Sequence, residues 1–158
     1  MLTTRFFCML IIMEIGRDKS QVQEIWETNE EKKLSLGDLK HKYLSFARKL
    51  FIRNPPVVIK NNEKNWPIEL SRRVISEWRI KSRTRERILS IQLLDEMIKG
   101  AKYIKTIEDM KNTPGIASVS YFENQCLING KMFRINITIK TQKLHKRKFA
   151  YYFSATEI

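Results

Sequence analysis

The spacing of apolar residues changes along the chain, from helical steps in the first two thirds to strict alternation in the last third. Between Leu36 and Leu50, apolar residues recur at steps of three and four, which is one face of an α-helix. Ser35 followed by Asp38 is typical of a helix start, and the later Asn-Pro-Pro is typical of a stop. This stretch is therefore predicted to be a helix with a buried stripe.

The rest of the first two thirds predicts shorter elements. A helix capped by Thr84 carries a stripe of buried residues, namely Ile88, Ile91, Leu94, Ile98 and Ala101, and Gly100 lies near its end. The other expectations are a polar helix over 19–33, strands at 57–60 and 68–71, a short helix or irregular connection at 72–82, and a loop at 103–117.

The last third is dominated by a predicted β-hairpin around Asn129-Gly130. Both residues tolerate positive φ, so they favour a two-residue type I′ turn, which fixes the register of the two strands. Position 128 then lies opposite 131, 126 opposite 133, and 122 opposite 137. A third strand is predicted at 149–155.

The two faces of this hairpin differ in chemistry, because directly opposite residues share a face. The core face collects Phe122, Cys126, Phe133, Ile135, Ile137 and Ile139, with Asn124 as an exception. The other face collects Tyr121, Glu123, Gln125, Arg134, Asn136, Thr138 and Lys140. Helices followed by a β-meander predict an α+β fold, in which N-terminal helices pack on one face of a C-terminal antiparallel sheet.

The chain of 158 residues favours one domain, predicted at 35–158, preceded by an N-terminal extension at 1–34. Residues 6–13 form an apolar run that is too short to span a bilayer, so no stable membrane insertion is expected. The run is either a buried strand or sequence ahead of a true start at Met13. A weak signal-peptide core is the third alternative, although no small-residue cleavage site follows it.

The excess of basic over acidic residues indicates which class of molecule the protein binds. The formal net charge is +13, with 30 Lys and Arg against 17 Asp and Glu. Such an excess favours a polyanion: a nucleic acid, an acidic protein or an acidic membrane surface. Two distant cysteines and two histidines offer neither a disulfide framework nor a metal-binding cluster, so a reducing compartment and no cofactor are expected. The five glycines form no phosphate-binding loop.

Three residues have the side-chain types needed to cleave RNA through its own 2′-hydroxyl. That reaction uses a base, a cation at the phosphorus and an acid at the leaving oxygen. Glu123 and Arg134 are diagonal neighbours on the open face, and His145 in the following turn is expected to fold back over them. The alternative is an ordinary cross-strand ion pair with a solvated histidine.

Basic and polar residues around these three extend the candidate surface. Trp78 among its cations either stacks on an unpaired base or packs in the core. The candidate nucleic-acid contacts are Arg72, Arg73, Trp78, Arg79, Lys81, Arg83, Tyr121, Asn136, Thr138, Lys140, Lys146 and Arg147.

Four segments together resemble the phage-associated barnase-like and RelE-like nuclease domains of the superfamily that includes colicin-type tRNases. They are "NWPIELSRR" at 65–73, "MIKGAKYI" at 97–104, "YFENQCLINGKMFRINITIK" at 121–140 and "KFAYYF" at 148–153. The resemblance covers roughly residues 40–155. It implies helices behind a sheet whose open face cuts RNA, in a toxin with an inhibitor protein or in a module of a phage polyvalent protein.

The chain departs from that family at three positions where phage members carry histidine. Ser76-Glu77-Trp78, Ser120 and Tyr151-Tyr152-Phe153 stand there instead. Either the fold persists with degraded catalysis, or the chemistry uses another set of residues, as RelE-like members do with Arg, Lys and Tyr.

The sequence thus predicts a metal-independent endoribonuclease acting on tRNA or mRNA, with an acidic inhibitor or antitoxin protein as a further partner. The alternative is a module that keeps the nuclease fold and only binds nucleic acid or a partner protein. The expected location is a reducing cytoplasm, or that of an exported or injected effector.

Overall fold

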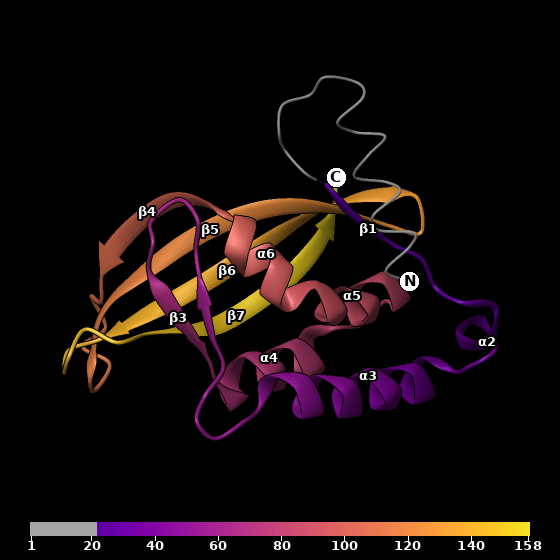
Figure 1. Ribbon diagram of the computed structural model, residues 1–158, viewed down its shortest axis with the longest axis horizontal. Coiled ribbons are helices and arrows are strands. Elements are labelled where there is room, and N and C mark those ends of the chain that lie inside the picture. Colours follow the sequence, from indigo (N-terminus) through magenta and orange to yellow (C-terminus); the bar gives the residue numbers. More distant parts are fainter. Residues whose placement is uncertain (1–21) are drawn as a thin grey trace.

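A computed structural model describes residues 22–158 of the chain (Figure 1). The apolar run at 6–13 and the start of the helix expected at 19–33 lie outside these residues. The elements in chain order are β1 (Gln23–Ile25), α2 (Asn29–Lys32), α3 (Leu36–Phe51), β2 (Val58–Lys60), β3 (Pro67–Leu70), α4 (Arg72–Lys81), α5 (Arg85–Leu89), the 3₁₀ turn η1 (Ser90–Leu93), α6 (Leu94–Gly100), β4 (Lys102–Glu108), β5 (Ile116–Ile128), β6 (Lys131–Gln142) and β7 (Lys148–Glu157).

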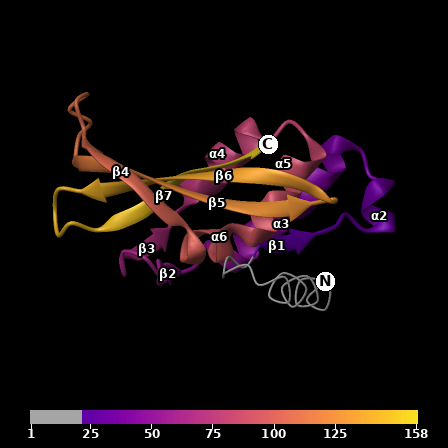
Figure 2. The same ribbon diagram turned by 90° about the horizontal axis from the view of Figure 1, so that it is seen from above.

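Seven strands form one curled sheet, and the helices lie on one of its faces, which confirms the predicted α+β class (Figure 1). The strand order is β1-β5-β6-β7-β3-β2. Strand β4 pairs with the same edge of β5 as β1 does, but with its first half, whereas β1 pairs with its last residues. The sheet is mixed rather than purely antiparallel, because β1 runs parallel to β5 and β3 runs parallel to β7. Figure 2 looks from above, with the strands in front of the helices.

The hairpin register predicted from Asn129-Gly130 is confirmed. Both turn residues have positive φ, 53° and 80°, and the pairs 128–131, 126–133 and 122–137 all form. Every apolar residue assigned to the core face is buried. Asn124, the exception on that face, donates from Nδ2 to the backbone oxygen of Met97 in α6 at 3.1 Å. The amide therefore ties the sheet to the helical layer.

The helical layer follows the predicted stripes with two differences. Within α3, Leu39 and Tyr43 are buried, whereas the end positions Leu36 and Leu50 are each about 40% exposed. The stripe begun by the Thr84 cap is buried throughout, but the chain forms α5, the turn η1 and α6 instead of one helix. The stretch 72–82 is the regular helix α4, capped by the Ser71 hydroxyl.

Two sequence predictions were wrong. The segment 19–33 is not a helix where it is described: Gln23–Ile25 is a strand on β5, and only Asn29–Lys32 is helical. The predicted loop at 103–117 begins instead with strand β4. Both strands are edge strands, and β4 is exposed along most of its length, so neither carries the alternation that marks a half-buried strand.

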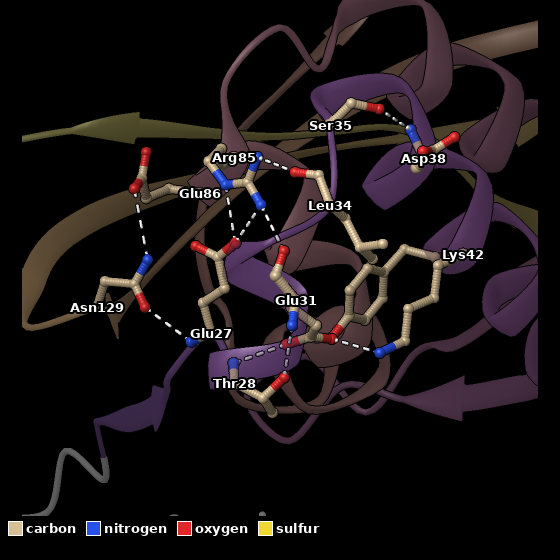
Figure 3. Close-up of polar contacts among 11 residues, drawn as sticks. Glu27, Thr28, Glu31, Leu34, Ser35, Asp38, Lys42, Arg85, Glu86 and Asn129 are labelled. Atoms are coloured by element: carbon tan, nitrogen blue, oxygen red, sulfur yellow. Dashed lines mark hydrogen bonds and ion pairs between the residues drawn. The ribbon is translucent and has the colours of Figure 1, made fainter.

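A buried polar network ties β1 and α2 to the helices (Figure 3). Arg85 donates to the Glu27 carboxylate at 2.8 Å and to the backbone oxygens of Glu31 and Leu34 at 2.7 and 2.9 Å. The Glu31 carboxylate, 2% exposed, accepts from Tyr43, from Lys42 and from the Thr28 backbone. Burial raises the pKa of Glu31, but these hydrogen bonds outweigh it and hold the pKa below its ordinary value.

Candidate nucleic-acid interface

The face of the sheet opposite the helices carries many polar and cationic side chains, with a few apolar ones such as Val119 and the pair Leu127–Met132 among them. Cross-strand triplets on it run from β5 through β6 to β7, for example Tyr121–Thr138–Tyr152 and Glu123–Asn136–Ser154. From β4, Lys105 lies over the Tyr121 ring, with its Nζ 5.8 Å from the ring centroid. We call this surface, made by the residues of β4 to β7 that point away from the helices, the open face. Hydroxyls, amides and cations at this spacing suit contacts to phosphate and sugar.

Glu123 and Arg134 meet on the open face as the register predicts. Arg134 Nε lies 2.7 Å from Glu123 Oε1, and the side chains are 49% and 36% exposed. Tyr121, Asn136, Thr138 and Lys140 share this face. An ion pair this exposed contributes roughly 0.2–1 kcal/mol to the stability of the fold, so a contribution to folding is not a sufficient reason for these two residues to be paired here.

His145 does not join that pair. Strand β6 continues from Arg134 for eight residues to Gln142 before the turn begins, which at about 3.4 Å per residue is roughly 27 Å. The turn is closed by Gln142 N donating to the backbone oxygen of Arg147 at 2.8 Å, and His145 is exposed with φ 61°. The expectation that His145 folds back over Glu123 and Arg134 is wrong for this reason. Catalytic roles for Glu123, Arg134 and His145 stay a prediction, with the ion pair on the open face and the histidine in the β6–β7 turn.

A different set of residues converges beside Lys140. Arg73, at the start of α4, donates from Nη2 to the Tyr151 hydroxyl at 2.6 Å, and its Cζ lies 4.9 Å from that ring's centroid. Lys140 Nζ lies 3.5 Å from the same centroid. We call these three residues the tyrosine cluster. The hydrogen bond from Arg73 is the largest cause of the lowered pKa of Tyr151. Burial opposes it, and the charges of Lys140 and Arg73 lower the pKa further, against a small raising effect of Glu77.

A β-bulge puts Tyr151 in this position. Thr138 pairs with Tyr152, and the next residue, Ile139, pairs with Ala150, so Tyr151 is the extra residue of β7. A bulge re-aims the side chain of its extra residue and is common beside active sites. Parallel pairing of β3 with β7 then brings the start of α4 to the same place, and Ser71 Oγ donates to the backbone oxygen of Ala150 at 3.2 Å.

The tyrosine cluster borders a pocket of about 260 Å³. Its walls come from β3, the start of α4 and the ends of β6 and β7, and they are formed by Glu69, Ser71, Arg73, Gln142, Arg147 and Phe149. Arg147 is held by two hydrogen bonds from its guanidinium to the Glu69 carboxylate, at 2.8 and 2.6 Å. This ion pair lowers the pKa of Glu69.

Most predicted contacts on α4 and after it are exposed. Arg72, Arg73, Arg79, Lys81 and Arg83 all reach solvent, and so do Lys146 and Arg147 in the β6–β7 turn. Trp78 does not: it is 1% exposed, and its Nε1 donates to the backbone oxygen of Arg87 at 3.1 Å. Trp78 therefore packs in the core, which was one of its two predicted roles, and neither face of its ring is accessible to a nucleic-acid base.

Sequence reasoning missed Tyr151 as a member of a site. In the sequence, Tyr151 stands out only as a departure from the resembled family and as the first of three consecutive aromatic residues beside basic segments. Arg73 was predicted to contact nucleic acid, but its partner lies 78 residues further along the chain. Only the bulge and the parallel β3–β7 pairing bring the two together.

Residues 22–158 contain neither a metal-binding cluster nor a membrane-spanning helix. No group of three or more His, Cys, Asp or Glu side chains there has the arrangement needed to hold a metal ion. In the same part of the chain, no helix is long and apolar enough to cross a membrane.

Comparison with protein families gives one match. The family described as large polyvalent protein-associated domain 3 matches residues 35–151, which is most of the chain and contains the tyrosine cluster and all of the open face except the part of β7 after residue 151. The match supports the part of the resemblance that concerns phage polyvalent proteins. Neither the curated proteins nor the solved structures yield a match.

Proposed function

The chain belongs to the large polyvalent protein-associated domain 3 family, and we propose that in this setting it is a metal-independent endoribonuclease of toxin or phage-protein type. The observation that carries the proposal is a tyrosine at the border of the open face whose hydroxyl accepts a hydrogen bond from an arginine and whose ring lies under a lysine ammonium. A phenol with a lowered pKa beside two cations combines a base with phosphate-binding charge.

Each member of the tyrosine cluster has a role in the proposed reaction. Tyr151 as phenolate takes the proton of the ribose 2′-hydroxyl. The 2′-oxygen then bonds to phosphorus, the bond from phosphorus to the 5′-oxygen breaks, and that oxygen takes a proton from the cluster, for which the Lys140 ammonium is a donor. Arg73 and Lys140 stabilise the negative charge that builds up on the phosphoryl oxygens. The products are a 2′,3′-cyclic phosphate and a 5′-hydroxyl.

The open face supplies the path for the rest of the strand. Arg134 and Lys140 lie on the same side of β6, six residues or roughly 20 Å apart, with Asn136 and Thr138 between them. This arrangement would hold an extended RNA strand mainly through its phosphates and sugars. Tyr121 belongs to the same surface, and the surface is extended by Arg73 and Lys81 of α4, which lie against the rings of Tyr151 and Tyr152, and by Arg147 of the β6–β7 turn. An acidic inhibitor protein would cover this surface, and a reducing cytoplasm is the proposed place of action.

The test is incubation of the purified chain with total tRNA and an mRNA in EDTA, followed by analysis of the new ends. We expect 2′,3′-cyclic or 3′-phosphate ends, a loss of rate of at least a hundredfold in Tyr151→Phe, and a similar loss in Arg73→Met. Tyr103→Phe is the matched control, because its hydroxyl bonds only Thr106 on the other side of the sheet. Equal rates for Tyr151→Phe and Tyr103→Phe would reject the proposed base.

One observation favours a second candidate function, a module that binds nucleic acid without cutting it. Glu123 is already neutralised by Arg134, and His145 is remote from both, so the acid–base pair first expected on this face is not assembled. This alternative predicts no cleavage, together with an affinity for RNA that falls linearly on a log–log plot against salt. Arg134→Ala should reduce that slope by about one phosphate contact.

A further inference from the structure

The pocket beside the tyrosine cluster opens on the open face. Phe149 pairs with Lys140 across β6 and with Glu69 across β3, so all three side chains emerge on this side of the sheet. Arg73 belongs both to the pocket wall and to the tyrosine cluster. A group bound in the pocket would therefore lie next to a phosphate held by Arg73 and Lys140.

The walls combine an aromatic ring with hydrogen-bonding groups. Phe149 is half-buried, so part of its ring faces the pocket. The Gln142 side chain forms no hydrogen bond with the described residues, which leaves an amide with both donor and acceptor capacity at the rim. The paired Glu69 and Arg147 side chains also line the pocket, and their two hydrogen bonds hold them in place.

The size of the pocket limits what it can take. The pocket is open to solvent on one side, and its volume of about 260 Å³, below the roughly 300–1,000 Å³ of pockets for drug-sized ligands, matches a group of one or two rings with the rest of the ligand outside. We propose, resting on the proposed function, that the pocket binds one unpaired base of the RNA substrate, stacked on Phe149 and hydrogen-bonded at its edge by Gln142. Stacking on an aromatic ring accepts every base, and the amide then discriminates among them.

The test measures binding of small probes to the full chain by NMR titration. The probes are the four nucleoside 3′-monophosphates, together with ribose 5-phosphate and inorganic phosphate, which lack a base. We expect at least one nucleotide to bind about fivefold or more tightly than ribose 5-phosphate. We expect Phe149→Leu to bring that ratio close to one and Gln142→Ala to reduce the differences among the four bases.

Phe46→Leu is the matched control, because Phe46 is a half-buried phenylalanine of α3 on the far side of the sheet. Its ratio of nucleotide to ribose 5-phosphate affinity should equal that of the unmodified chain. Gln142→Ala alters an amide at the pocket rim, and this second variant keeps the test decisive if Phe149→Leu fails to fold.

The outcomes separate the two proposals. A ratio near one in the unmodified chain, or an unchanged ratio in both Phe149→Leu and Gln142→Ala, overturns the base pocket. If the unmodified chain still cleaves tRNA or mRNA in EDTA in that case, the proposed function stands. If neither the phosphate probes nor RNA binds, the proposed function fails and the base pocket fails with it.

Discussion

Replacing Arg85 by Met should destabilise the fold more than any other single loss of charge in the polar network of Figure 3. The guanidinium bonds the Glu27 carboxylate through two nitrogens and also the backbone oxygens of Glu31 and Leu34. The Glu27 side chain is 5% exposed and that of Arg85 is 30% exposed, so water replaces few of these bonds. Methionine keeps the stem and removes every donor.

The loss of stability in Arg85→Met depends on the Glu27 carboxylate, which stays buried without its partner. Breaking a buried ion pair on one side costs about 3–5 kcal/mol, because the remaining charge is buried without a partner. The partial exposure of Arg85 places this case at the lower end, at about 3 kcal/mol. Adding Glu27→Gln removes the stranded charge, so the double variant should be more stable than Arg85→Met alone.

The assay is equilibrium unfolding in urea, with hydrogen exchange at the Ile25 amide as a local readout of β1. Arg83→Met is the matched control, because Arg83 is exposed and lies two residues before Arg85, in the connection that leads into α5; it should change stability by at most about 0.5 kcal/mol. A loss below about 1 kcal/mol in Arg85→Met, or a double variant less stable than that single variant, would refute the reasoning.

Three further predictions rest on single residues. Gly130→Ala should cost about 1–2 kcal/mol in urea unfolding, because its φ is 80° and the added Cβ would lie 3.1 Å from Trp26, whereas Gly37→Ala in open space on α3 should stabilise by about 0.5–1 kcal/mol; equal effects would contradict this. With the other cysteine replaced, Cys126 should react with a thiol reagent only on unfolding, since burial removes access and raises its pKa to about 12; rapid labelling of the native protein would disprove it. The cleavage rate should rise with pH, with the midpoint of the rise below the ordinary tyrosine pKa of 10.0, because only ionised Tyr151 acts as the base. A pH profile that is the same in Tyr151→Phe would exclude that role.

Local chemistry fixed those parts of the fold that the sequence predicted correctly. Asn129-Gly130 permits only a short turn with positive φ, and a two-residue turn leaves one register for the strands beside it. Every pair along β5 and β6 near the turn then follows, together with the ion pair of Glu123 and Arg134. The caps at Ser35 and Thr84 likewise act within their own helices.

The features that escaped prediction depend on partners remote in sequence. Strand β1 is three residues long and exists only because it pairs with Cys126–Ile128, about a hundred positions later. Strand β4 is exposed along most of its length, so its sequence lacks the alternation of apolar and polar residues that predicts a strand. The contact of Tyr151 with Arg73 needs a bulge and a parallel strand pair, and neither has a local pattern in the sequence.

The position of β1 has a practical consequence for anyone who would express this domain alone. The family match begins at residue 35, so a fragment cut there would lose β1, α2 and both buried carboxylates of the polar network. The unpaired end of β5 would then present bare N–H and C=O groups with apolar side chains beside them, a template for pairing between copies. We expect such a fragment to aggregate and a fragment starting at residue 22 to stay dispersed, so the family boundary falls inside the cooperative folding unit.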